Sequence, residues 1–216
     1  MNQDYKIFSM TLGIAATNAY FLYKESHDAG DGKRHGIFFD PPTKGGMIYD
    51  ELTKRDFVID AILLTHAHFD HIGGAAELRE KSGAKIYCPE AERRLCEDAD
   101  FNCSASWGHP MTIDPDVWFA DNEEFTCAGM NCKVLYTPGH TEGSCCFYFE
   151  EGELLIAGDS LFHQSVGRTD LPTGSMGTLV RSIRERLFTL PDDTVVFPGH
   201  MDETTIGFEK QHNPFL

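Results

Sequence analysis

The sequence predicts an α/β fold, and three observations support this prediction. Short apolar runs, typical of buried strands, alternate with longer segments in which apolar residues recur at helical spacing. Several of these runs lead directly into turns that carry histidine or aspartate, at the strand ends where α/β sheets place their chemistry. The length of 216 residues suits one domain with a substantial core, so residues 1–216 are expected to form a single domain.

The expected elements follow one another along the whole chain. Strands, the first two paired as a hairpin, are expected at residues 7–12, 18–23, 37–40, 59–64, 133–136, 153–157 and 194–197. Helices are expected at residues 46–54, 70–82 and 176–187. The second helix begins with an acidic residue and ends before Gly83, which are start and stop signals. The apolar residues of the third helix predict that it covers a sheet.

Two segments lack a regular pattern. Residues 25–34 are polar and rich in glycine and charge, and they are expected to form an exposed turn. Residues 91–124 are rich in Asp, Glu and Cys and also contain Trp107 and Trp118. This second segment is either a surface excursion that its aromatic side chains anchor, or a wall over the functional site.

The segment Thr65–His71 carries the strongest functional signal in the sequence. It places three histidines and one aspartate close together, directly after an expected strand. Residues two apart in an extended segment point the same way, so His66 and His68 can bind one metal together. After a bend, Asp70 and His71 can reach a second metal. Packing alone explains such a cluster poorly, because each buried imidazole or carboxylate must find a partner.

Three later turns each carry one further candidate ligand. They are the Pro-Gly-His turn at His140, the Gly-Asp-Ser turn at Asp159 and the Pro-Gly-His turn at His200. Each turn follows a short apolar run, and each alone would be a weak signal because such turns are common. Together with the histidine cluster, they indicate that ligands converge from several strand ends onto one site.

These motifs resemble those of the metallo-β-lactamase superfamily, whose signature is H-x-H-x-D-H followed by a His, a bridging Asp and a final His. Within that superfamily the chain is most similar to the short relatives of glyoxalase II. The similarity includes residues 137–144, 158–162, 167–170 and 212–216. The resemblance covers nearly the whole chain and implies a four-layer αββα sandwich, in which helices flank two mixed sheets.

The resemblance also implies two metal sites that share one carboxylate. The metal ligands would be His66, His68 and His140 for the first ion, Asp70, His71 and His200 for the second, and Asp159 as the bridge. Asp70 and Asp159 would therefore be catalytic, with a water or hydroxide between the two ions. Imidazoles and carboxylates suit Zn, Fe and Mn, and two divalent ions per chain, with zinc first, are expected.

Hydrolysis is the reaction that this resemblance implies. Two metals about 3.5–4 Å apart lower the pKa of bound water toward ~7, and the resulting hydroxide attacks a carbonyl. The substrate would be a thioester such as S-lactoylglutathione or a related small acyl compound. Asp159 stands where lactam-hydrolysing relatives with a Cys ligand carry cysteine, which argues against that activity.

An iron-dependent persulfide dioxygenase is the alternative that the sequence leaves open. Members of that family look similar and also carry a Gly-Arg-Thr-Asp segment, which is residues 167–170 here. Their single iron would be held by His66, His140 and Asp159. The continuation at residues 171–174 and the C-terminal His-Asn-Pro-Phe-Leu favour the hydrolase.

Several residues near these motifs have their own expected roles. Arg168 either pairs with Asp170 or meets a substrate carboxylate, and Asp170 is a candidate to orient a metal-bound histidine. His27 and His35 flank the polar turn and are expected to be solvated. His212 is expected to pack or to form a hydrogen bond in the C-terminal segment.

Composition argues against several partner classes. The formal net charge of −16 disfavours nucleic acid, because phosphate binding needs basic patches. No apolar stretch approaches the roughly 18–20 residues of a membrane span, and the N-terminus lacks a signal-peptide pattern. Seven cysteines with no Cys-x-x-Cys pair fit reduced thiols. A cytoplasmic protein that acts on a small molecule is therefore expected, with no membrane partner.

Overall fold

The computed structural model describes residues 1–216 and contains two six-stranded mixed sheets. The N-terminal sheet has the order β1 (Tyr5–Leu12), β2 (Thr17–Lys24), β3 (Arg34–Phe39), β4 (Phe57–Leu63), β5 (Lys85–Pro89) and β6 (Val117–Phe119). The C-terminal sheet has the order β14 (Thr204–Thr205), β13 (Val195–Pro198), β10 (Leu154–Gly158), β9 (Cys145–Phe149), β8 (Met130–Tyr136) and β7 (Glu124–Cys127). A separate small hairpin consists of β11 (Leu161–Phe162) and β12 (Ser165–Val166).

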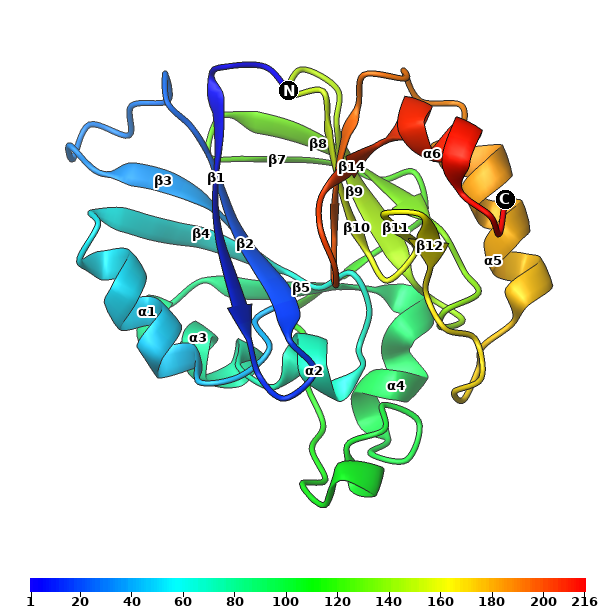
Figure 1. The fold of residues 1–216 in the computed structure, drawn as a ribbon. Coiled ribbons are helices and arrows are strands. Elements are labelled where there is room, and N and C mark those ends of the chain that lie inside the picture. Colours follow the sequence, from blue (N-terminus) through cyan, green and yellow to red (C-terminus); the bar gives the residue numbers. More distant parts are fainter.

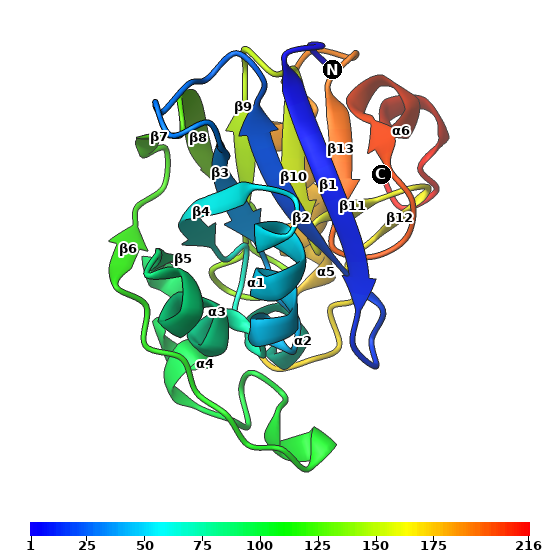
Figure 2. The same ribbon diagram turned by 90° about the vertical axis from the view of Figure 1, so that its left-hand side faces the viewer.

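Helices cover the outer face of each sheet, which gives the four layers seen in Figures 1 and 2. The N-terminal sheet is covered by α1 (Gly45–Thr53) and α3 (Ala75–Ser82). The C-terminal sheet is covered by α5 (Met176–Ser182) and α6 (Ile206–His212). The remaining helical segments are α2 (Phe69–Ile72), α4 (Arg93–Glu97) and single turns at Glu90–Glu92, Ala105–Trp107 and Ile183–Leu187. The predicted fold of two mixed sheets flanked by helices is confirmed.

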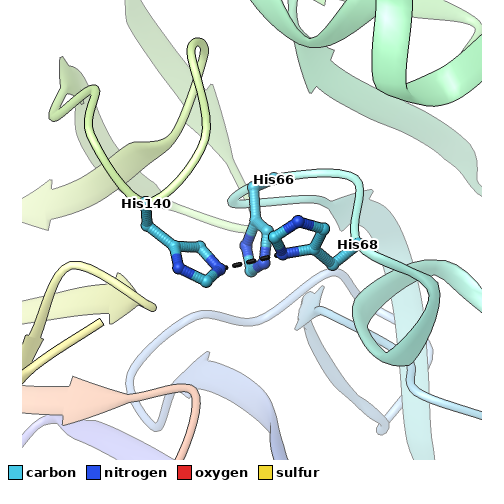
Figure 3. A group of neighbouring side chains, drawn as sticks. All are labelled: His66, His68 and His140. Carbon is cyan, nitrogen blue, oxygen red and sulfur yellow. Dashed lines mark hydrogen bonds between the residues drawn. The ribbon is translucent and has the colours of Figure 1, made fainter. Parts of the chain in front are cut away.

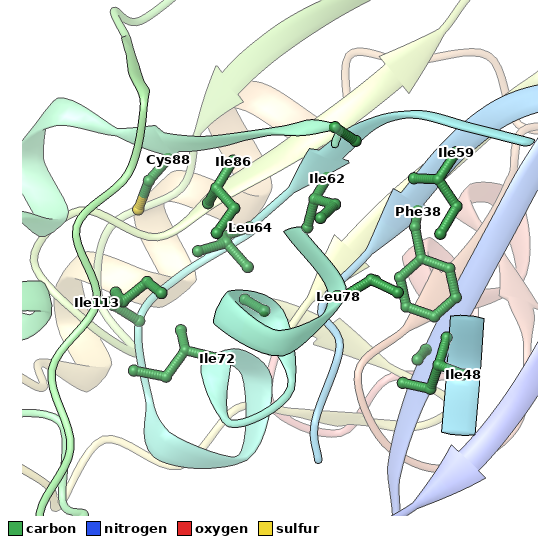
Figure 4. Packing of buried hydrophobic residues seen from close by; sticks show 14 of the residues in the cluster. Phe38, Ile48, Ile59, Ile62, Leu64, Ile72, Leu78, Ile86, Cys88 and Ile113 are labelled. Carbon is green, nitrogen blue, oxygen red and sulfur yellow. The ribbon is translucent and has the colours of Figure 1, made fainter. Parts of the chain in front are cut away.

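Three layers of apolar side chains hold the sandwich together. The first lies between the N-terminal sheet and its helices and includes Phe38 and Leu78 (Figure 4). The second lies between the two sheets and includes Phe39 and Phe147. The third packs Leu179 and its neighbours against the C-terminal sheet. Phe38 and Phe39 enter different layers because successive side chains of a strand point to opposite faces, so unbroken apolar runs suit strands buried on both faces.

The seven predicted strands are all present, with ends that differ by a few residues. The predicted hairpin is confirmed, since Tyr5 pairs with Lys24 and Leu12 pairs with Thr17 in an antiparallel register. Residues 91–124 are more regular than expected, because they contain α4 and β6, and β6 extends the N-terminal sheet.

The predicted helix at residues 70–82 is wrong as a single element, because the chain forms two short helices, α2 and α3. The break falls at Gly73 and Gly74. A Cβ atom at Gly73 would clash with the carbonyl oxygen of Pro42, so only glycine fits this close approach. The break lets α3 pack on the N-terminal sheet while α2 stays at the strand ends.

The other two predicted helices are confirmed as α1 and α5, although the last turn of the second, Ile183–Leu187, has π geometry. Ser175 caps α5 by accepting a hydrogen bond from the backbone N–H of Thr178 at 3.4 Å. None of the helices is both long enough and apolar enough to cross a bilayer.

The predicted exposed turn at residues 25–34 is present, but the solvated state expected for His35 is wrong. The His35 ring is half-buried, with Nδ1 2.7 Å from an oxygen of Asp60. His212 behaves as predicted, because its Nδ1 donates to the carbonyl oxygen of Phe208 at 3.0 Å and its ring stacks on that residue.

Candidate metal centre

Loops that follow strands of both sheets bring all seven predicted ligand residues together. His66 and His68 lie in the loop after β4, and the short helix α2 carries Asp70 and His71. The other three follow β8, β10 and β13 and are His140, Asp159 and His200. The ligand atoms form three overlapping groups, and within each group they lie within 4.8 Å of one another.

One group, called the imidazole group here, consists of His66, His68 and His140. Its three rings converge from two loops (Figure 3), and none is more than 2% exposed. The His68 Nδ1 atom lies 2.9 Å from His140 Nε2. The centroid of the His66 ring lies 4.9 Å from that of His68 and 4.8 Å from that of His140. Three buried rings at these separations form a compact set of nitrogen donors.

The second group, called the mixed group here, consists of Asp70, His71 and His200. The Asp70 Oδ2 atom lies 3.4 Å from His200 Nε2 and 3.6 Å from His71 Nε2. The side chains of His200 and Asp70 are 23% and 14% exposed, whereas the His71 side chain is fully buried. The mixed group is therefore the part of the centre that solvent reaches.

Asp159 lies between the two groups. One of its oxygens, Oδ2, is 3.4 Å from His140 Nε2 and 3.4 Å from His200 Nε2. The other, Oδ1, is 3.5 Å from His71 Nε2. Asp159 is thus the carboxylate that faces ligands of both groups.

The hydrogen bonding at the centre tests whether these residues fit a metal site. The buried atoms His66 Nε2, His68 Nε2, His71 Nε2 and Asp159 Oδ1 have no hydrogen-bond partner. Buried polar groups are almost always paired, because an unpaired one costs about 1–3 kcal/mol. Three of them, His66 Nε2, His71 Nε2 and Asp159 Oδ1, belong to residues whose ligand atoms lie within 4.8 Å of one another, which fits a cation held by nitrogen and oxygen donors.

The two groups differ in charge. Burial lowers the pKa of His66 and His140 and lowers that of His68 to about 3, so these rings are neutral at pH 7. Burial opposes protonation of His71 and His200 too, but the nearby carboxylates of Asp70 and Asp159 outweigh burial and raise the pKa of His71 to about 9 and that of His200 to about 10. A cation entering the mixed group must therefore displace protons.

Backbone and side-chain acceptors fix two of the imidazole rings. The His140 Nδ1 atom donates to the carbonyl oxygen of Arg168 at 2.7 Å, which leaves Nε2 with the free lone pair. The Thr65 hydroxyl donates to Asp40, so the contact of 3.0 Å between Thr65 Oγ1 and His66 Nδ1 requires the ring to donate. Both rings thus present Nε2 to the centre.

Asp40 is a residue of this site that sequence reasoning missed. Its buried carboxylate accepts hydrogen bonds from the Thr65 N–H and hydroxyl, both at 2.7 Å, and lies 3.1 Å from His71 Nδ1. Asp40 therefore holds the start of the ligand loop at Thr65 and places a negative charge beside the ring of a proposed ligand. The signal for it was an acid placed directly after the apolar strand β3 and before two prolines.

Glu92, also missed, joins the two loops that carry the imidazole group. Its carboxylate is fully buried and accepts hydrogen bonds from the Ala67 N–H at 2.8 Å, the Thr141 hydroxyl at 2.6 Å and the Gly143 N–H at 2.8 Å. Burial raises the pKa of Glu92 to about 7 despite these three donors. Glu92 therefore holds the His66–His68 loop against the His140 loop.

Arg168 and Asp170 form an exposed ion pair, with both nitrogen–oxygen distances at 2.8 Å. The expectation that Asp170 orients a metal-bound histidine is wrong, because the carbonyl oxygen of Arg168 takes that position beside His140. The side chain of Arg168 points to its partner at the surface, and its contact with substrate stays a prediction.

Comparisons with known proteins place this arrangement in a family. The family model described as the metallo-beta-lactamase superfamily matches residues 28–200. The probable metallo-hydrolase YqgX of Bacillus subtilis is 38% identical, over 96% of this chain and 95% of that protein. The hydroxyacylglutathione hydrolase GloC of Haemophilus influenzae is 35% identical, over 86% of this chain and 89% of that protein.

Two solved structures share both fold and sequence with the chain. BLEG-1, a B3 metallo-β-lactamase, aligns with a TM-score of 0.90 and 37% identity, over 98% of this chain and 99% of that one. TTHA1623 in a di-iron-bound form aligns with a TM-score of 0.83 and 36% identity, over 97% of this chain and 100% of that one. The chain belongs to the metallo-β-lactamase superfamily.

Proposed function

We propose that the chain is a metal-dependent hydrolase of thioesters such as S-lactoylglutathione or of related small acyl compounds. The observation that carries this proposal is the position of Asp159. Its two carboxylate oxygens face both ligand groups, and one of these oxygens, Oδ1, has no hydrogen-bond partner. We assign one divalent ion to the imidazole group and one to the mixed group, with Asp159 between them. We also assign residues 1–216 to one domain, because both sheets contribute ligands.

When bound, two divalent ions lower the pKa of a water molecule and polarise a substrate carbonyl. The groups of the chain prepare the site for these ions. Burial keeps the imidazole group neutral, which is the form that donates a lone pair. The Arg168 carbonyl orients His140 through its second nitrogen, and the Asp40 carboxylate lies 3.1 Å from the second nitrogen of His71. The ionised Asp159 offsets the repulsion between two cations.

The relatives support this class of reaction. GloC of Haemophilus influenzae is a hydroxyacylglutathione hydrolase, and YqgX of Bacillus subtilis is a probable metallo-hydrolase. The donor set suits zinc first, and iron or manganese also fit it; TTHA1623 was solved with two irons. Solvent reaches the centre only at the mixed group, through the partly exposed His200 and Asp70. Such limited access is consistent with a small-molecule substrate.

Opening of a β-lactam ring is a second candidate, favoured by the similarity to BLEG-1. Both reactions begin with attack of an activated water on a carbonyl carbon, so the same groups serve either one. Thioester hydrolysis and β-lactam opening differ in the shape of the substrate that the residues around the metal centre must accommodate.

The test is an assay without oxygen. Protein stripped of metal and reloaded with zinc is expected to bind about two ions per chain and to cleave S-lactoylglutathione anaerobically, because zinc is redox-inert and still a Lewis acid. Faster cleavage of a chromogenic cephalosporin than of any thioester would favour the second candidate.

The persulfide dioxygenase alternative predicts a different result. It needs iron and consumes oxygen in the presence of glutathione persulfide. Oxygen uptake by the iron-loaded protein, together with no thioester cleavage under any metal loading, would overturn the hydrolase proposal.

A further inference from the structure

A cleft of about 670 Å³ opens beside the mixed group, and we call it the Trp107 cleft. Its lining includes Leu12, Ile14, Phe69, Asp70, Trp107 and Met111. One wall is the turn between β1 and β2, and the other is the loop 101–111. Both walls lie at the end of the molecule that carries α2 (Figures 1 and 2). Asp70 belongs to the cleft and to the mixed group, so the cleft adjoins the proposed metal centre.

Both walls are hydrogen-bonded to α2. Thr17, which follows the β1–β2 turn, donates to Asp70 Oδ2 at 2.7 Å. On the other wall the Phe69 N–H donates to the carbonyl oxygen of Asn102 at 3.0 Å. The buried side chain of Asn102 donates in turn to the carbonyl oxygen of Met111 at 2.9 Å. The walls are therefore fixed relative to the ligand Asp70, as a specificity pocket requires.

Large apolar side chains stand exposed on both walls. Ile14 on the turn is 78% exposed, and Trp107 on the loop is 52% exposed. The Trp107 ring lies 5.2 Å from the Phe69 ring, with the planes inclined by 31°. Scattered exposed apolar residues are ordinary, but a cluster around one cleft is typical of a binding site.

The charges of the cleft disfavour a peptide ligand there. Lys44 is the only lysine or arginine in the lining, and Asp70 is the only carboxylate. Glutathione carries two carboxylates and one ammonium group, so its recognition would need more than one cation. The net charge of −16 also repels anions. An apolar group matches this lining better than a charged tripeptide does.

Building on the proposed hydrolase function, we propose that the Trp107 cleft binds an aromatic or branched aliphatic group of the substrate. The substrate class is then a thioester with a bulky apolar group. Water adds to the carbonyl carbon, the carbon–sulfur bond breaks, and the products are a carboxylic acid and a thiol that takes up the remaining proton. The apolar group belongs to either the acyl or the thiol half, and the test separates these two cases.

The kinetic test compares three thioesters with the zinc-loaded protein. They are acetyl-N-acetylcysteamine, phenylacetyl-N-acetylcysteamine and the acetyl thioester of benzyl mercaptan. One phenyl-bearing compound is expected to have a kcat/KM about 10- to 100-fold above that of the first, the range set by burying one apolar group. The compound that shows this gain identifies the half that enters the cleft. Equal kcat/KM values for all three would overturn the proposal.

Variants of the two walls locate the effect. Trp107→Ala is expected to lower the ratio of phenyl-bearing to acetyl kcat/KM about 10-fold, and the exposed Ile14→Ala about 3-fold. Met47→Ala is the matched control, because Met47 on α1 is 64% exposed and lies outside the cleft. A ratio that neither wall variant changes would contradict the assignment.

A binding measurement separates this inference from the proposed function. The chain has two tryptophans, so Trp118→Phe leaves Trp107 as the only one. Phenylacetate is expected to change its fluorescence saturably, and acetate is not. A saturable change without any thioester cleavage would remove the proposed function and keep the cleft assignment. Thioester cleavage with no fluorescence change, and with equal kcat/KM values for phenyl-bearing and acetyl thioesters, would keep the proposed function and remove the cleft assignment.

Discussion

The imidazole group and the mixed group both face Asp159 but differ in burial, charge and access. The rings of His66, His68 and His140 are at most 2% exposed, and burial lowers the pKa of each. The mixed group contains a carboxylate, keeps protonated histidines, and borders the Trp107 cleft through Asp70. The difference is that the imidazole group is neutral before any cation arrives, whereas a cation entering the mixed group would compete with protons.

Removing the carboxylate of Asp159 should affect both groups and have the largest effect. Asp159→Ala leaves two cations with no intervening negative charge, so we expect loss of bound metal and a fall in activity of about 10³-fold or more. Elemental analysis and circular dichroism measure the metal content and the retained fold. Asp202→Ala, an exposed acid near His200, is the control. A variant that holds both ions at wild-type affinity would show that Asp159 is not the bridge.

Lowering the pH should separate the two groups. The pKa values of His71 and His200 are raised to about 9 and about 10, so both carry protons below these values. Each displaced proton costs about tenfold in apparent affinity per pH unit, up to about 100-fold for two. We expect chelator competition at pH 8, 7 and 6 to remove the mixed-group ion first. Loss of both ions at the same pH would contradict the inference that the mixed group is protonated and the imidazole group neutral.

Replacing Glu92 should loosen the imidazole group more than the mixed group. Glu92→Ala leaves buried donors at Ala67, Thr141 and Gly143 without their acceptor. We expect the free energy of unfolding to fall by about 3 kcal/mol and metal affinity to fall by about 10- to 100-fold. Denaturant unfolding and zinc titration measure these changes, with the exposed Glu90→Ala as control. Lower stability with unchanged metal affinity would limit Glu92 to a structural role.

Arg168→Ala should have the smallest effect. The backbone carbonyl that orients His140 remains, and the side chain loses only an exposed ion pair with Asp170 worth about 0–1 kcal/mol. We expect the metal content and the kcat/KM for S-lactoylglutathione to change less than about threefold. A large rise in KM alone would instead support contact between Arg168 and a substrate carboxylate.

Local signals made much of the fold predictable. The hairpin of β1 and β2 follows from two apolar stretches separated by a short turn, and the structure pairs these two strands in an antiparallel arrangement. The histidine cluster at residues 66–71 was visible because its members are adjacent in sequence. The break at Gly73 was missed because a Gly-Gly pair shows a bend only when the neighbouring Pro42 loop is known.

The supporting contacts of the site could not be read in the same way. Glu92 lies on a 3₁₀ turn far in sequence from the loops it joins, and nothing in its neighbourhood marks it as buried. The acceptor for His140 is a backbone carbonyl, and every residue has one. Asp40 had a detectable position at the end of β3, but its partner His71 comes from another element.

Five of the seven cysteines lie buried in the three apolar layers. Cys88 and Cys96 lie in the first layer, Cys132 and Cys145 in the second, and Cys146 in the third. Burial raises the pKa of Cys132 to about 12 and that of Cys146 to about 11, and burial also raises those of Cys88 and Cys145 well above the ordinary range. Alkylating reagents attack the thiolate, so these four buried thiols resist them in the folded chain. The labelling rate at each of these thiols therefore measures how often its own apolar layer unfolds locally and exposes it.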